Sequence, residues 1–110
     1  MLQFGQGQVH AIDAQTLKQG LAQNAVILID VREPAEFSAE HIPGAMLVPL
    51  SRFDPRKIPQ PQGKQLVLYC HSAARSAIAA QKLLNAGFSQ VAHLSGGIIA
   101  WKQAGLPTER

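Results

Sequence analysis

The chain has 110 residues, of which 46% are hydrophobic, which fits one globular domain and excludes a largely disordered chain. Ten Lys and Arg against seven Asp and Glu give a formal net charge of +3, and these basic residues are scattered, so the dense basic stripe of a nucleic-acid-binding protein is missing. No apolar run approaches the about 18 residues of a membrane span, and Met1 to Gln8 lacks the pattern of a secretory signal. We therefore expect a cytoplasmic protein that binds neither nucleic acid nor membrane.

Apolar runs alternate with helical patterns along the chain, which is typical of β-α-β units on a parallel sheet. Val9 to Ile12 predicts a first strand. Asp13 suits the N-cap of a helix that carries Leu17 and Leu21 on one face. Ala25 to Ile29 is apolar throughout, as expected for a strand that is buried on both faces.

The middle of the chain predicts less regular structure. A polar stretch over 31–42 leads into a turn at Pro43-Gly44 and a third strand over Ala45 to Val48. Prolines break the following segment, 51–63, in which we expect one short helical turn around Arg52 and Phe53 and otherwise loop.

The last part of the chain returns to alternating elements. Leu66 to Tyr69 predicts a fourth strand, followed by a helix that ends at Gly87. The apolar face of that helix is expected to consist of Ala77, Ala80, Leu83 and Leu84. Val91 to Leu94 predicts a fifth strand, and a turn at Gly96-Gly97 leads into a last helix that carries Ile98, Ile99 and Trp101. Five strands and about four helices predict an α/β layered fold in a single domain.

Cys70 is the only cysteine, which excludes an internal disulfide framework and a multi-cysteine zinc site. It lies between a buried strand and the start of a helix, at the sheet edge where open α/β folds place their sites. The loop His71-Ser72-Ala73-Ala74, closed by Arg75 and Ser76, can direct successive backbone N–H groups to one point, and the helix adds its positive dipole end. We expect these groups and the Arg75 charge to favour the Cys70 thiolate and to hold an anion against the sulfur.

The spacing between Cys70 and Arg75 distinguishes two chemistries. Four residues lie between them. Protein tyrosine phosphatases and their relatives have one residue more between the nucleophilic cysteine and its arginine, which gives a ring that holds a tetrahedral phosphate. The shorter loop makes a tighter cup, and this favours one added sulfur atom on Cys70.

Three stretches of the chain together resemble one known family. They are Asp30 to Phe37 running into His41 to Ala45, the loop Cys70 to Ser76, and Leu94 to Trp101 with Ala104 to Pro107. These stretches resemble the rhodanese family of sulfurtransferases, and the resemblance covers essentially all of residues 1–110 as a single rhodanese domain. It implies a three-layer α/β fold with a five-stranded parallel sheet flanked by helices, a nucleophilic Cys70 that accepts sulfane sulfur, and no metal or organic cofactor.

Two residues depart from the usual pattern of that family. Glu40 stands where a glycine commonly precedes His-Ile-Pro-Gly, and Ala73 stands where glycine is common in the loop. Because alanine resists a positive φ, the departure at Ala73 bears on the shape of the loop and on substrate preference.

Other charged residues near the predicted strand ends admit two interpretations. Asp30, Arg32, Glu33 and Glu36 could supply paired carboxylates for acid–base chemistry. We favour a supporting role, in which Asp30 ends a strand and Arg32 bridges to a nearby carboxylate and fixes the loop. Ser76 is expected to support the loop from the helix.

The four histidines are assigned different roles. His71, next to Cys70, is a candidate for contact with a donor anion, whereas His41 is expected to cap or pack the turn at Pro43-Gly44. His10 and His93 carry no functional signal, and no two histidines have the spacing of metal ligands.

The sequence therefore predicts a thiosulfate-type sulfurtransferase. The Cys70 thiolate takes the outer sulfur of an anionic donor such as thiosulfate, and the resulting persulfide passes it to a thiophilic acceptor such as cyanide or a cellular thiol. Backbone N–H groups of residues 71–75 hold the persulfide, and Arg75 binds the donor. Two alternatives remain open: a phosphatase or arsenate reductase of related fold, and a non-catalytic rhodanese binding module.

Overall fold

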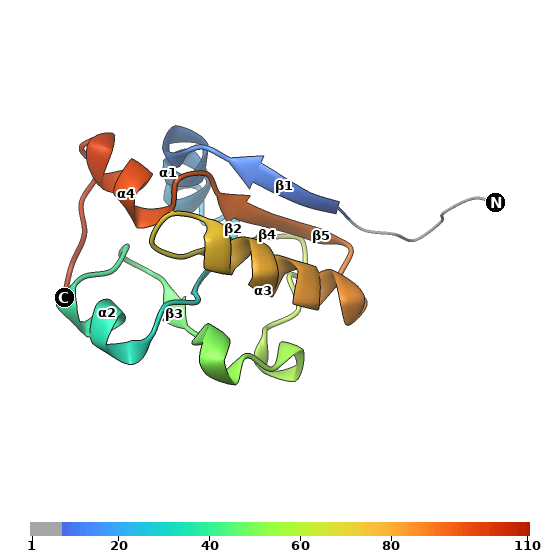
Figure 1. Cartoon of the computed structure of the whole chain (residues 1–110). Coiled ribbons are helices and arrows are strands. Elements are labelled where there is room, and N and C mark those ends of the chain that lie inside the picture. The colour runs from blue at the N-terminus through green and yellow to red at the C-terminus, as the bar shows by residue number, and fades with distance from the viewer. Residues whose placement is uncertain (1–7) are drawn as a thin grey trace.

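A five-stranded, all-parallel sheet in the order β1-β5-β4-β2-β3 forms the centre of the computed structural model, which describes residues 8–110 (Figure 1). The strands are β1 Gln8–Ile12, β2 Val26–Asp30, β3 Met46–Leu47, β4 Gln65–Tyr69 and β5 Gln90–Leu94. The helices are α1 Ala14–Ala22, α2 Pro34–Ala39, α3 Ala74–Asn85 and α4 Gly97–Gln103. The predicted α/β fold with five parallel strands is confirmed.

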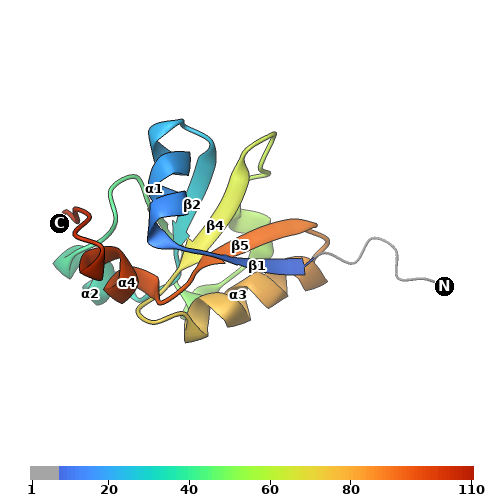
Figure 2. The same ribbon diagram turned by 90° about the horizontal axis from the view of Figure 1, so that it is seen from above.

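Helices cover both faces of the sheet and give the three layers (Figure 2). On one face, α3 packs on the sheet through Ala79, Ala80 and Leu83. On the other face, α1 and α4 pack through residues that include Leu17 and Trp101. Each layer of apolar side chains is removed from water, and this burial is the main force that stabilises the fold.

Local signals in the sequence account for several features of these elements. The predicted N-cap is confirmed, since the Asp13 carboxylate accepts a hydrogen bond of 2.8 Å from the backbone N–H of Thr16. In the central strand β4, residues 66–69 are buried, as expected for a strand covered on both faces. Gly87, where the sequence predicts the helix to end, follows α3 with a left-handed φ of +102°.

The structure differs from the sequence-based expectations in the middle of the chain. Helix α2 lies inside the stretch 31–42, for which the sequence predicts no helix. Its residues are not buried, so the apolar periodicity that reveals a helix is missing. What starts this helix is local: Pro34 occupies its first turn, and Glu36 accepts a 2.9 Å hydrogen bond from the backbone N–H of Glu33.

Three smaller differences concern extent and exposure. The strand expected over Ala45 to Val48 is two residues long, and 3₁₀ turns at Leu50–Arg52 and Pro55–Lys57 replace the single turn expected around Arg52 and Phe53. Ala77, expected on the apolar face of α3, is exposed, and Ser76 and Ala79 are buried instead. The sequence could not place this face because alanines lie on several sides of the helix.

Residues 1–7, most of the stretch in which the sequence shows no secretory signal, lie outside the described residues. Within residues 8–110, every helix is too short or too polar to cross a membrane.

Candidate functional site

Cys70 lies directly after β4 and just before α3, with its sulfur inside the loop that joins them. The backbone N–H of Ala73 donates to Cys70 Sγ at 3.1 Å, and that of Ser76 donates at 3.2 Å. Because Ser76 is in the first turn of α3, the second donor belongs to the positive end of a 12-residue helix. Two converging N–H groups and the helix end favour a negatively charged sulfur here.

The shape of this loop depends on an unusual conformation at Ala73. Its φ is +104°, in the region that alanine disfavours. This conformation directly precedes α3 and accompanies the contact between the Ala73 N–H and the sulfur. The loop thus takes a glycine-like conformation although the sequence supplies alanine.

The far side of the loop rests on the beginning of α4. The backbone N–H of Ile98 donates to the Cys70 carbonyl at 2.9 Å, and that of Ile99 donates to the His71 carbonyl at 3.3 Å. Gly97 allows this approach, because a Cβ at this position would overlap both carbonyl oxygens. The turn predicted at Gly96-Gly97 therefore positions the loop as well as starting α4, a role that its distance in sequence from Cys70 conceals.

Arg75 forms an ion pair with Glu36 that the sequence did not reveal. Its Nη1 and Nη2 donate to the two carboxylate oxygens of Glu36 at 2.7 and 2.9 Å. The Arg75 hydrogen bond lowers the pKa of Glu36 to about 2, and Glu36 in turn raises the pKa of Arg75. The full charge that the sequence predicts Arg75 to bring to Cys70 is therefore compensated by a carboxylate of α2.

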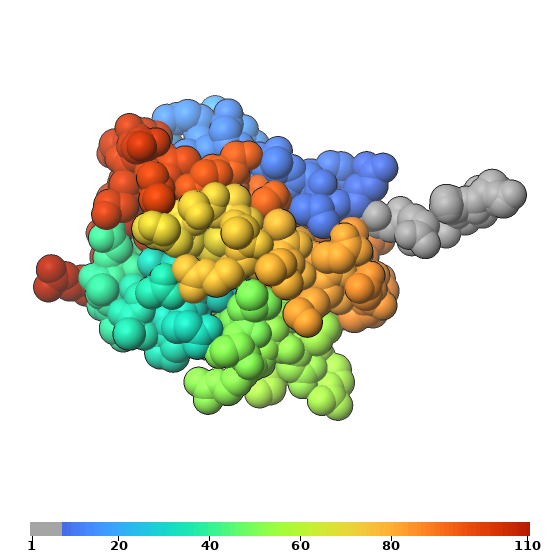
Figure 3. Space-filling model, in the orientation of Figure 1, coloured from blue at the N-terminus to red at the C-terminus, as the bar shows by residue number. Residues whose placement is uncertain are grey.

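This ion pair joins the loop to α2, and the two segments lie side by side on the surface (Figure 3). Glu36, which the sequence offered as one of four residues for acid–base chemistry, instead partners Arg75. A link between residues 36 and 75 could be found from the sequence only if α2 had been placed at the same end of the sheet as Cys70.

The predicted bridge from Arg32 to a nearby carboxylate is confirmed. Arg32 Nε and Nη2 donate to Asp30 at 3.0 and 2.7 Å, and both side chains are buried. Arg32 Nη2 also donates to the backbone carbonyl of Glu40 at 2.7 Å. The pair therefore fixes the chain after β2 to the end of α2.

Two histidines make contacts that the sequence did not predict. His41 stacks on Phe37 with 3.8 Å between ring centroids, and its Nδ1 is 2.8 Å from the Phe37 carbonyl oxygen, so its ring packs on the end of α2. His93 carries no functional signal in the sequence, yet its Nδ1 lies 2.9 Å from Ser76 Oγ. Ser76 Oγ in turn lies 3.6 Å from Cys70 Sγ. His93 thus becomes a neighbour of the site through the packing of α3 on β5.

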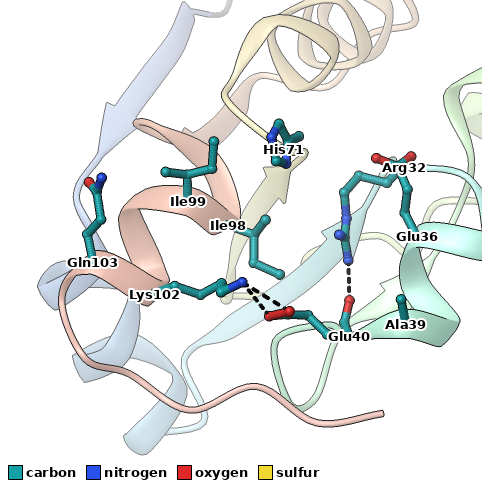
Figure 4. A pocket seen from close by; sticks show the side chains of 9 residues that line it. All are labelled: Arg32, Glu36, Ala39, Glu40, His71, Ile98, Ile99, Lys102 and Gln103. Atoms are coloured by element: carbon teal, nitrogen blue, oxygen red, sulfur yellow. Dashed lines mark hydrogen bonds and ion pairs between the residues drawn. The ribbon is translucent and has the colours of Figure 1, made fainter.

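A cavity of about 540 Å³ opens beside the loop, between α2 and α4 (Figure 4). It is lined by Arg32, Glu36, Ala39, Glu40, His71, Ile98, Ile99, Lys102 and Gln103. Lys102 crosses from α4 to the Glu40 carboxylate at 3.0 Å. His71 and Ser72, two of the predicted substrate-binding residues, are exposed, as is Ala74, and His71 is on the wall of this cavity.

A family model described as rhodanese-like domain matches residues 13–104. The chain belongs to the rhodanese family. The resemblance carried by the three sequence stretches is thereby confirmed. A sulfurtransferase of Allochromatium vinosum is 41% identical to this rhodanese domain over 100 residues, which cover 90% of the chain and 94% of the relative.

Two further proteins are similar to this chain, one in sequence and the other in both fold and sequence. An uncharacterized protein of Synechocystis is 56% identical over 97 residues, 88% of this chain, and the match spans about half, 54%, of that relative's length. The crystal structure of the Alr3790 protein of Anabaena superimposes with a TM-score of 0.80 at 31% identity, covering 89% of this chain and 81% of that one.

Proposed function

We propose that residues 1–110 act as a single-domain sulfurtransferase that carries one sulfur atom on Cys70. The observation that carries this proposal is the pair of backbone N–H groups that converge on Cys70 Sγ at 3.1 and 3.2 Å. Membership of the rhodanese family and the sulfurtransferase name of the Allochromatium relative support sulfur transfer as the general activity. Thiosulfate as donor, and cyanide or a cellular thiol as acceptor, are our proposal for the substrates.

In the first step, the Cys70 thiolate attacks the outer sulfur of thiosulfate. A new S–S bond forms to Sγ, while the bond between the two sulfur atoms of thiosulfate breaks and sulfite leaves with its electron pair. The persulfide keeps one negative charge. The N–H groups of Ala73 and Ser76 donate to the inner sulfur, and we expect the other backbone N–H groups of residues 71–75 to hold the terminal one.

In the second step, the acceptor attacks the terminal sulfur. The bond between that sulfur and Sγ breaks, and Cys70 returns to the thiolate that the two N–H groups hold. Donor and acceptor react in turn with one cysteine, so the kinetics should be ping-pong. The thiolate needs no general base in either step, which agrees with the exposed position of His71.

Arg75 is proposed to orient the anionic donor from the rim of the loop. Its guanidinium is only half-buried and is held by Glu36, so its position is set before the donor arrives. Because Glu36 already compensates the charge, we expect Arg75 to contribute orientation more than overall attraction.

Mass spectrometry after incubation with thiosulfate tests the proposal. The parent protein should gain one sulfur atom on Cys70 and release one sulfite, and cyanide should remove that sulfur as thiocyanate. Cys70→Ser, which is close in size, should fold normally and gain no sulfur. A parent protein that gains no sulfur from thiosulfate or a persulfide donor would refute the proposal. Hydrolysis of an aryl phosphate would instead support a phosphatase, and the absence of both reactions a binding module.

A further inference from the structure

Cys70, Ser76 and His93 form a chain of polar contacts that the transfer mechanism does not yet use. Cys70 Sγ lies 3.6 Å from Ser76 Oγ, which lies 2.9 Å from His93 Nδ1. Ser76 Oγ also lies 3.1 Å from the backbone carbonyl of Ala73. Ser76 is buried, and His93 is half-buried in β5, so this chain runs from the sulfur into the layer between α3 and the sheet.

Counting protons determines how these contacts can be hydrogen bonds at the same time. The Ser76 hydroxyl has one proton for three neighbours, which are Cys70 Sγ, the Ala73 carbonyl and His93 Nδ1. The Ala73 carbonyl also accepts the backbone N–H of Ala77 at 3.1 Å, so it stays satisfied when the hydroxyl turns away. The hydroxyl proton is therefore free for an anionic sulfur only if His93 Nδ1 carries a proton of its own.

We propose that His93 is a positioning residue for Cys70: its Nδ1–H donates to Ser76 Oγ, so that the Ser76 hydroxyl donates to Cys70 Sγ whenever that sulfur is anionic. The inference rests on the proposed function and adds a third donor to the thiolate, besides the N–H groups of Ala73 and Ser76. His93 touches neither donor nor acceptor and acts only through Ser76.

The position of His93 in the fold suits this role. It pairs in register with Leu68 of β4, two residues before Cys70, and α3 carries Ser76 over the same part of β5. Burial lowers the pKa of His93, so its imidazole is neutral at neutral pH and carries one N–H. Which nitrogen holds that proton decides whether the imidazole donates to Ser76 or accepts from it.

Nitrogen NMR of the imidazole rings tests the proton's position directly. The chain has four histidines, and the signals missing from His93→Asn identify those of His93. The proposal requires the Nδ1–H tautomer in the parent protein at neutral pH. An Nε2–H tautomer would refute it, because Ser76 would then donate to His93 and not to Cys70.

Alkylation by iodoacetamide tests the effect on the sulfur, since Cys70 is the only thiol in the chain. At pH 7, Ser76→Ala should react about tenfold more slowly than the parent, a loss in the range of one charge-assisted hydrogen bond. His93→Leu should also react more slowly, by a smaller factor, because it keeps the Ser76 hydroxyl but removes the N–H that orients it. His93→Asn should retain most of the rate, because its amide N–H can occupy the place of Nδ1–H. The control His10→Leu, on the exposed part of β1, should react like the parent.

A double variant distinguishes an effect of His93 that acts through Ser76 from a general disturbance of the structure around Cys70. Ser76→Ala should slow alkylation at pH 7, and His93→Leu added to it should cause no further loss. Additive losses, or an His93→Leu variant that reacts at the parent rate, would refute the inference. Alkylation does not involve sulfur transfer, so these outcomes are independent of the proposed function, which fails only if the parent protein forms no persulfide.

Discussion

Two arginine–aspartate pairs of this domain have nearly the same local geometry. Arg32 donates to Asp30 from its backbone N–H, Nε and Nη2 at 2.9, 3.0 and 2.7 Å. Arg56 donates to Asp54 from the same three groups at 2.9, 3.1 and 2.9 Å. In each pair the arginine follows two residues after the aspartate. The pairs therefore form a matched comparison in which local sequence spacing is constant.

Their surroundings differ. The side chains of Arg32 and Asp30 are 5% and 0% exposed, whereas those of Arg56 and Asp54 are 90% and 26% exposed. Removing one partner of a buried pair leaves an uncompensated charge and costs about 3–5 kcal/mol, while an exposed pair contributes at most about 1 kcal/mol. We therefore expect Arg32→Met to lower the free energy of unfolding by about 3–5 kcal/mol, and Arg56→Met to leave it almost unchanged.

Urea unfolding followed by circular dichroism measures both values, provided the slope with denaturant is unchanged. The double variant Asp30→Leu/Arg32→Met should recover part of the loss, because it leaves no buried charge unpaired. Equal costs for Arg32→Met and Arg56→Met would refute the reasoning from burial. A double variant less stable than Arg32→Met would show that the packing of these side chains matters more than their charge.

Three further changes test the loop and its contacts. Ala73→Gly should raise the free energy of unfolding by about 1 kcal/mol, because glycine adopts the φ of +104° without the strain that alanine has there. Ala74→Gly, in the first turn of α3, should lower it by about 0.5 kcal/mol, and equal effects of the two changes in urea unfolding would contradict this reasoning. Gly97→Ala should lower the free energy of unfolding by about 2 kcal/mol more than Gly105→Ala and should slow sulfur transfer, because both glycines have a positive φ but, of the two, Gly97 alone has backbone atoms within reach of a Cβ. Comparable melting temperatures of the two variants would exclude that clash. The pKa of Glu36 is lowered from 4.5 to about 2, so its ion pair stabilises the fold above about pH 4.5, and this stabilisation disappears as the pH falls toward 2. Glu36→Gln should therefore flatten the fall in the free energy of unfolding over this range, by at most about 1 kcal/mol for a side chain that is 36% exposed, and a pH profile like the parent's would show that the pair contributes nothing.

The sequence by itself identifies the central strands and the position of the reactive loop. Continuous apolar runs identify the central strands, and Asp13 identifies the start of α1, because burial on both faces and helix capping are local requirements on residue type. The position of Cys70 after a strand, and its spacing to Arg75, likewise need no knowledge of other elements. These features could be predicted since each depends on neighbours in the chain.

Only the tertiary structure decides which distant groups meet the loop. Glu36 reaches Arg75 because α2 lies at the end of the sheet where Cys70 is, and α2 has no apolar stripe from which to predict it. His93 reaches Ser76 because β5 lies beside β4 under α3, an order that crossover connections determine and strand composition does not. Hydrogen bonds and ion pairs act over about 3 Å, so the partners of the loop follow from the packing of whole elements, which no local pattern of residues specifies.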